Sequence, residues 1–244
     1  MNPQDFLRLC AIDGASFLAP LDDPAGIVAD AHIGPTDGSL GGGITLLADG
    51  PSSVIPQAVA ADGTNDYVSF PGDAGQLAGD FTIESWYYPT AGGERTILSK
   101  SDTAHSGDAL PRLWLLQRNN DRVRFAHRLT NGGGFVGQES TSTFPLNTWK
   151  HIVVSRRGTN LEFWLDGALD RTVGGYTTAT FGAFTADLQV SRFWNGSAGW
   201  NYSAGRAGPQ AIYPHALTPE QIQRHFLLGA DRLVRRQRRL ATRI

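Results

Sequence analysis

Residues 81–100 read FTIESWYYPTAGGERTILSK, and residues 149–167 read WKHIVVSRRGTNLEFWLDG. Both stretches alternate β-branched or aromatic residues with other residues, which is typical of strands that bury one face in a core. The second stretch also contains turn signals at residues 157–160 and at Asp166-Gly167, so it predicts a hairpin. Together the two stretches predict pieces of an antiparallel β-sandwich.

Other short alternating segments, separated by turn residues, run along the rest of the chain. We expect strands at residues 44–48, 67–70, 81–88, 96–100, 112–117, 122–128, 149–156, 161–166 and 188–194. Many short strands separated by turns favour a sandwich over alternating βα units. In the strand at 81–88, Phe81 and Ile83 fall on one face, whereas Glu84 and Trp86 fall on the other. A length of 244 residues suits one large all-β domain.

Two further motifs flank these stretches in order, namely DGTNDYVSF at residues 62–70 and ALTPEQI at residues 216–222. The four pieces together resemble the laminin-G-like branch of the concanavalin A-like lectin/glucanase jelly rolls. The resemblance implies an all-β fold, a two-sheet antiparallel jelly-roll sandwich with a C-terminal α-helix. It also suggests three parts: an N-terminal arm at residues 1–16, the jelly-roll domain at 17–228 and an Arg-rich C-terminal helix at 229–244.

The N-terminal residues and the composition limit where the protein can act. Residues 1–15 suit either a short helix around residues 6–9 or an extended arm on a neighbouring molecule. The single cysteine, Cys10, excludes an intramolecular disulfide. The sequence shows neither a secretion signal nor an apolar run of about 18 residues, so we expect no membrane span.

A helix is predicted to begin near the C-terminus. Thr218 supplies a hydroxyl N-cap, Pro219 stands at the first helical position, and Gln221 can complete a capping box. Six arginines against one aspartate give residues 230–244 a net charge of +5, whereas the whole chain carries −2. The C-terminal tail is therefore basic, whereas the rest of the chain is acidic.

Apolar residues recur along one side of the helix that is predicted for this tail. Three interpretations of the contacts of this helix stay open. The helix could pack on its own domain, dock on a partner chain or a second copy, or contact nucleic acid through its arginines. No aromatic residues or groove-reading motif accompany the charge, so nucleic acid is the least favoured partner. The candidate docking residues are Leu233, Arg235, Arg236, Arg239, Leu240 and Ile244.

Catalysis is not expected. Retaining glycanases of this superfamily carry two glutamates with an aspartate between them on one strand, and that pattern does not occur in this sequence. The nearest approach is Glu162 with Asp166, but Asp166 is better explained as the turn residue of Asp-Gly. His151 is interpreted as a structural histidine.

We expect no cofactor, with calcium as the alternative. Oxygen ligands on loops bind calcium in many members of the superfamily. Candidate ligands here are Asp22, Asp23, Asp62, Asn65 and Asp66. Many relatives supply further carboxylates from the start of the last strand, whereas this chain has Gly208-Pro209 at the matching positions. That departure argues against the site, and plain turn geometry explains the same aspartates.

A glycan site needs an aromatic platform beside a few polar groups. The best candidate is the glycine-rich segment that contains Trp194, Asn195, Trp200, Asn201 and Tyr202. Alternatively, these aromatic residues only complete a core strand and cover one end of the sandwich. A second candidate is the segment 112–120 with the preceding loop 101–110, at a rim of the sandwich.

These observations predict a non-catalytic attachment or structural protein of a phage or phage-like virion, such as a tail, baseplate or capsid-decorating protein. It would contact virion proteins or copies of itself through the C-terminal helix, and host-surface glycans through loops at the sandwich rim. The alternative is a carbohydrate-binding module of a bacterial extracellular protein. A hydrolase with an unusual site is a third class, without support from any motif.

Overall fold

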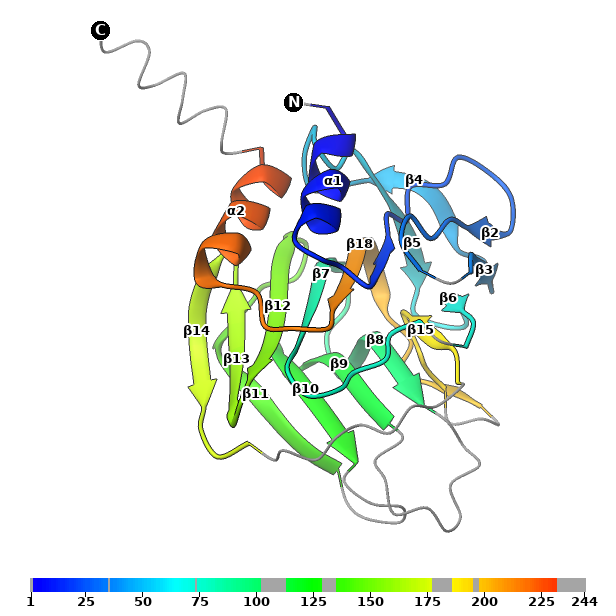
Figure 1. Ribbon diagram of the computed structural model, residues 1–244. Coiled ribbons are helices and arrows are strands. Elements are labelled where there is room, and N and C mark those ends of the chain that lie inside the picture. The colour runs from blue at the N-terminus through cyan, green and yellow to red at the C-terminus, as the bar shows by residue number, and fades with distance from the viewer. Residues whose placement is uncertain are drawn as a thin grey trace, which may run out of the picture.

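The computed structural model describes residues 2–34, 36–72, 74–101, 113–128, 135–176, 186–194 and 198–231. Two antiparallel sheets face each other, and two short helices lie side by side over the outer face of one of them (Figure 1). The expected jelly-roll sandwich is thereby confirmed. The helices are α1 (Gln4–Ile12) and α2 (Pro219–Gly229).

One sheet, sheet A, lies under the helices. It contains β1 (Phe17–Ala19), β4 (Thr45–Asp49), β5 (Gln57–Asp62), β7 (Phe81–Pro89), β12 (Lys150–Arg157), β13 (Asn160–Leu165), β14 (Ala168–Val173) and β18 (Ala204–Tyr213). The order across the sheet is β14-β13-β12-β7-β18-β5-β4, and β1 also pairs with β18. The β13–β14 turn has Asp166 and Gly167 with φ of 52° and 75°. Positive φ at both central residues is what a tight hairpin turn of this twist requires.

The other sheet, sheet B, forms the opposite layer. It contains β2 (Val28–Ala29), β3 (Gly38–Gly41), β6 (Tyr67–Phe70), β8 (Arg95–Ser101), β9 (Leu113–Asn119), β10 (Arg122–Arg128), β11 (Phe135–Thr143) and β15 (Leu188–Val190). Its order is β11-β10-β9-β8-β15-β6-β3-β2. Beside it, β16 (Phe193–Trp194) and β17 (Gly199–Trp200) form a separate two-stranded hairpin.

The main core fills the space between the two sheets. Phe81 and Ile83 of β7 lie in this core, whereas Trp86 lies in a second apolar cluster on the outer face of sheet A. Glu84 is buried at 1% exposure and makes its contacts on that same outer face, as the alternation predicts. Both faces of β7 are therefore buried, one by sheet B and the other by the helices.

The helices close the outer face of sheet A. Phe6 of α1 and Phe226 of α2 pack against Trp86, with ring centroids 6.5 and 6.2 Å apart. The predicted capping box at Thr218 and Gln221 is present at the start of α2. Of the two expectations for the N-terminal residues, the structure contains the helix, packed on the domain. In the described part of the chain, neither helix is long and apolar enough to span a membrane.

The strand β18 shows where the residue pattern misleads. It is ten residues long and lies in the middle of sheet A, although it contains Gly205, Gly208 and Pro209. A bulge between Ala207 and Gln210 accommodates the proline, which cannot donate to a sheet ladder. Gly205 has a φ of 147°, and a Cβ there would lie 2.1 Å from the carbonyl oxygen of Tyr88. The bulge and the absence of a side chain at Gly205 therefore permit a strand that alternation alone does not indicate.

Candidate functional site

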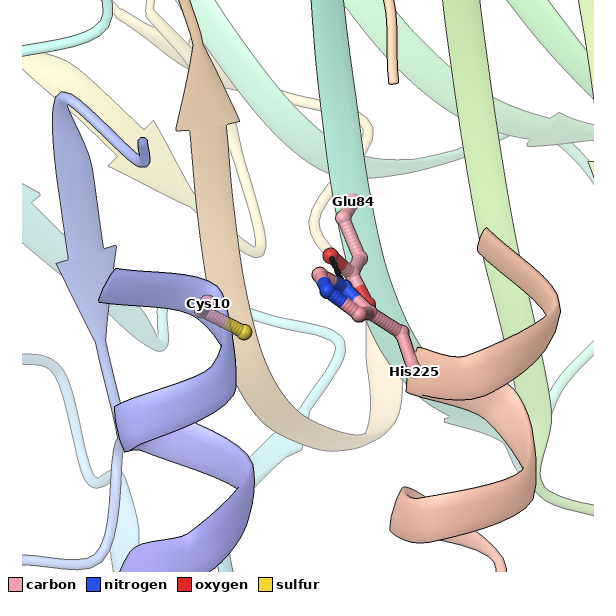
Figure 2. Close-up of side chains that lie close together, drawn as sticks. All are labelled: Cys10, Glu84 and His225. Atoms are coloured by element: carbon pink, nitrogen blue, oxygen red, sulfur yellow. Dashed lines mark hydrogen bonds and ion pairs between the residues drawn. The ribbon is translucent and has the colours of Figure 1, made fainter. Parts of the chain in front are cut away.

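A buried polar cluster joins both helices to sheet A. Cys10 comes from α1, Glu84 from β7 and His225 from α2, and their side chains converge under the helices (Figure 2). His225 Nδ1 lies 2.9 Å from Glu84 Oε2, and its Nε2 lies 2.8 Å from Asp13 Oδ2. The imidazole therefore bridges two carboxylates that belong to different elements.

Other polar groups make further hydrogen bonds to these two carboxylates. His151 Nε2 lies 2.8 Å from Glu84 Oε1, and the Tyr213 hydroxyl donates to Glu84 Oε2 at 2.8 Å. Arg224 donates to both oxygens of Asp13, at 2.9 and 2.7 Å. Each carboxylate thus has partners for both of its oxygen atoms.

The charges in this cluster stabilise one another. Burial alone would lower the pKa of His225, but the charge of Glu84 and the side-chain interactions with Cys10 and Glu84 together raise that pKa to about 11. Burial alone would raise the pKa of Glu84, but the charge of His225 and hydrogen bonds from His151 and His225 hold it well below its usual range. The protein at neutral pH therefore contains an imidazolium between two ionised carboxylates.

This arrangement is suited to stabilising the fold rather than to binding a metal ion. Among the described residues, Cys10, Glu84 and His225 are the one group of three His, Cys, Asp or Glu whose ligand atoms lie within 4.8 Å of one another. A histidine needs a free ring lone pair to bind a metal, and both nitrogens of His225 donate to carboxylates. Burial also raises the pKa of the Cys10 thiol, which disfavours the thiolate that metals prefer.

The aspartates considered for calcium organise separate turns. Asp66 accepts hydrogen bonds from the amides of Asp62, at 2.9 Å, and Gly43. Asp23 Oδ1 accepts from the amide of Asp30 at 3.0 Å. Asp22 and Asp23 show no convergence with the turn at residues 62–66 in the part of the chain that the structure describes. The absence of calcium stays a prediction.

The pair considered for catalysis is also engaged elsewhere. Asp166 accepts from Lys150 Nζ at 2.7 Å and from the amide of His151 at 3.1 Å, within the turn. Glu162 accepts from the indole nitrogen of Trp164 at 3.2 Å. The interpretations of Asp166 as a turn residue and of His151 as a structural residue agree with these contacts.

A different site lies on the outer face of sheet B. Trp114 and Leu116 of β9 point into the main core, whereas Leu113 and Leu115 form a small cluster with Ala126 and Phe193 on the other side. Gln117 continues the second set, because side chains alternate along a strand. A pocket of about 110 Å³ opens here, lined by Glu94, Leu115, Gln117, Arg124, Ala126, Phe193 and Asn201. We call it the sheet B pocket.

The polar lining of the sheet B pocket contains unused hydrogen-bonding capacity. Gln117 is 1% exposed, yet neither its Oε1 nor its Nε2 has a hydrogen-bond partner among the described residues. Thr96, its cross-strand neighbour on β8, is fully buried with an unpartnered hydroxyl. Buried polar groups in folded proteins nearly always have partners, so such atoms need an explanation.

The hairpin β16–β17 borders this pocket. Phe193, which lines the pocket, pairs directly with Trp200, and paired residues of an antiparallel hairpin project from the same face. Trp200 is 54% exposed. Trp194 is half-buried beneath the guanidinium of Arg192, which lies 4.7 Å from its ring centroid. Tyr202 packs against Gly199, where a Cβ would lie 2.0 Å from its hydroxyl oxygen.

The structure thus brings together parts of the two segments that the sequence suggested for glycan contact, and residues 102–112 of the second segment lie outside the described residues. Asn201 of the first and Gln117 of the second line one pocket. Glu94 and Arg124 were missed, because their place beside Gln117 depends on sheet register. Asn195 and the tail residues Leu233, Arg235, Arg236, Arg239, Leu240 and Ile244 lie outside the described residues.

Comparison with known proteins agrees with this fold. A family model described as the concanavalin A-like lectin/glucanases superfamily matches residues 62–223. A search of curated protein sequences found no match. The similar solved structures below are at most 17% identical to this chain, so the likeness concerns the fold alone.

Three of these structures illustrate the kinds of protein that have a similar fold. Domain 4 of AbnA, a GH43 extracellular arabinanase from Geobacillus stearothermophilus solved with arabinotriose, has 17% identity and a TM-score of 0.63, over 87% of this chain and 98% of that chain. The binding domain of Paraclostridial Mosquitocidal Protein 1 has 14% identity and a TM-score of 0.66, over 89% and 52%. The CBM40 of the Ruminococcus gnavus IT-sialidase, bound to α2,3-sialyllactose, has 12% identity and a TM-score of 0.56, over 68% and 94%.

Proposed function

Because the chain belongs to the concanavalin A-like lectin/glucanase superfamily, we propose that it is a non-catalytic module that binds glycans on the outer face of sheet B. The observation that carries the proposal is the buried, unpartnered amide of Gln117 at the wall of a pocket. Sugar sites combine such polar groups with an aromatic surface. Here Phe193 lies in the lining, and the exposed ring of Trp200 projects from the same face of its hairpin.

The lining also supports binding rather than hydrolysis. Glycoside hydrolysis typically needs two carboxyl groups on either side of the scissile bond. Among the residues that line the described pocket, Glu94 is the one carboxylate, and it lies 3.7 Å from the guanidinium of Arg124. Two of the solved neighbours with bound sugars are a domain of an arabinanase and a CBM40 of a sialidase.

We assign this binding an attachment role in a phage or phage-like virion. The support is the arginine-rich, apolar-striped pattern of residues 232–244, which suits docking on virion proteins or on a second copy. The second candidate is a carbohydrate-binding module of a bacterial extracellular protein, which is favoured by the fold shared with the arabinanase domain. Both candidates use the same glycan surface.

The test is binding of the full chain to an array of immobilised oligosaccharides, followed by titration calorimetry on the best ligand. Trp200→Ala should weaken binding at least about tenfold, or about 1.4 kcal/mol, because a stacking platform is lost. Leu169→Ala is the matched control, since Leu169 is 51% exposed but lies on β14 of sheet A. The proposal fails if the folded protein binds no glycan.

A result in which Trp200→Ala binds as tightly as the unaltered protein would remove Trp200 from the site. Glycan binding would then rest on the sheet B pocket alone. A melting curve of each variant shows whether the domain stays folded, which separates loss of binding from loss of structure.

A further inference from the structure

The side chains that line the sheet B pocket indicate the chemical class of its ligand. Its charged side chains, Glu94 and Arg124, have opposite signs and lie 3.7 Å apart. The pocket therefore has no net charge from these groups. An anionic ligand that approached Arg124 would have to displace Glu94 or lie beside its negative charge.

The unpartnered amide of Gln117 adds a stricter chemical condition. Its Nε2 is a donor and its Oε1 is an acceptor, and neither is used within the described structure. An ionised carboxylate is an acceptor only, so it could satisfy Nε2 but would leave Oε1 without a partner. A hydroxyl group both donates and accepts, and neighbouring hydroxyls on one sugar can serve both amide atoms.

The remaining lining suits the carbon skeleton of such a ligand. Leu115, Ala126 and Phe193 form an apolar cluster in the wall. Thr96, which pairs with Gln117 across the sheet but does not line the pocket, is a second buried residue with an unpartnered hydroxyl. A volume of about 110 Å³ limits the occupant to a small unit rather than a folded partner.

We infer that the sheet B pocket holds a neutral sugar unit, whose hydroxyl groups pair with both amide atoms of Gln117 and whose C–H face packs on Phe193. This inference rests on the proposed glycan-binding function and names its ligand class. It separates this chain from the sialidase CBM40, whose bound sugar, α2,3-sialyllactose, is acidic.

The experiment compares neutral and acidic probes on the full chain. An array carrying arabinotriose, cellotriose and lactose beside α2,3-sialyllactose gives the ranking, and calorimetry gives the dissociation constants. We expect a neutral probe to bind best, and Gln117→Leu to weaken that binding at least tenfold. Gln117→Glu keeps the side-chain shape but removes the donor, so it should also weaken binding at least tenfold.

Glu94→Gln is the charge control. It removes the negative charge beside Arg124, so binding of sialyllactose should rise while the neutral probe changes by less than about threefold. Melting curves identify any variant that does not fold. If Gln117→Leu does not fold, Gln117→Glu and Glu94→Gln still test the inference.

Three results overturn the inference. Preference for sialyllactose, lost in Arg124→Gln but kept in Gln117→Leu, would show an acidic ligand and leave the glycan-binding function standing. Neutral binding that neither Gln117 variant changes would place the sugar elsewhere and also leave that function standing. Binding of no probe by the folded protein would remove both the inference and the function.

Discussion

The carboxylates on the outer face of sheet A and the Gln117 amide on the outer face of sheet B differ in their hydrogen-bond partners. On sheet A, two helices cover the face, and the carboxylates of Glu84 and Asp13 pair with His151, His225, Tyr213 and Arg224. On sheet B, the face is open at a pocket, and both amide atoms of Gln117 lack partners in the described structure. The paired groups on sheet A hold the structure together, whereas the unpaired amide on sheet B is the group that we propose as a ligand contact.

The largest effect is expected from Glu84→Gln. This change removes the negative charge that the imidazolium of His225 and the hydrogen bond from His151 require. Breaking a buried charge pair on one side typically costs about 3–5 kcal/mol, and His225 would keep only the Asp13 carboxylate beside it. Urea denaturation should show a loss of that size, and a loss below about 1 kcal/mol would contradict the role given to this cluster.

The pH dependence of stability should follow from the same cluster. The pKa of His225 is raised to about 11 from 6.5, so its contribution is complete below about pH 6.5 and is lost as the pH rises toward 11. The pKa of Glu84 is lowered from 4.5, so its contribution is complete above about pH 4.5 and is lost as the pH falls. We therefore expect the free energy of unfolding to be greatest between about pH 4.5 and pH 6.5.

Above pH 6.5 the free energy of unfolding should decline by up to about 1.4 kcal/mol per pH unit for this one proton. Urea denaturation at several pH values between 6 and 10 measures the slope. His225→Gln should be less stable at pH 6 and should show a flatter slope. An equal slope in both proteins would assign the effect to other groups.

A smaller effect of opposite sign is expected on the open face. Gln117→Leu removes two buried polar atoms without partners, so it should leave stability unchanged or raise it by about 1 kcal/mol. Gln189→Leu is the matched control, because Gln189 is also buried but bonds to Ser69 at 2.7 Å and to Arg192 at 2.8 Å. The control should cost about 1–3 kcal/mol. Equal losses in both variants would mean that Gln117 has structural partners.

Deletion of residues 232–244 should change stability by less than about 0.5 kcal/mol. The contacts that fix the end of α2 are made earlier, by Gly229 with Ser52 and by Asp231 with Ser53. If the tail docks on a partner or on a second copy, its removal lowers the assembled mass in light scattering while melting stays cooperative. Loss of the cooperative transition would assign the tail to the fold.

No effect at all is expected from chelation. The candidate calcium residues near Asp23 and Asp66 already accept hydrogen bonds from backbone amides. A ligand that bound only the folded state would raise its melting temperature, so a chelator should leave that temperature unchanged. A drop that added calcium reverses would show a site.

Much of the sandwich could be predicted, because its signals are local. The alternation in β7 assigned Phe81 and Glu84 to the correct faces, and the Thr218 cap marked the start of α2. The strand predicted over 188–194 is divided in the structure at Ser191, whose φ is 68°. A change of backbone direction at a single non-glycine residue leaves no pattern in the sequence.

The two polar sites were not predictable to the same degree. Glu84 was assigned to a face, but its partner His225 lies 141 residues away in the chain, and Asp13 lies 212 residues from that histidine. For the pocket, the aromatic segment at residues 194–202 was recognised. The role of Gln117 was not, because its lack of a partner depends on everything around it.

The sequence by itself determined the alternation of the strands, their turns and the cap of the last helix. These features depend on neighbours within a few residues, so the physical preferences of each segment settle them. Only the tertiary structure decided that helices cover sheet A but leave a pocket on sheet B. It also decided which buried polar groups find partners, because hydrogen bonding across the fold depends on register, on packing and on atoms brought together from distant parts of the chain.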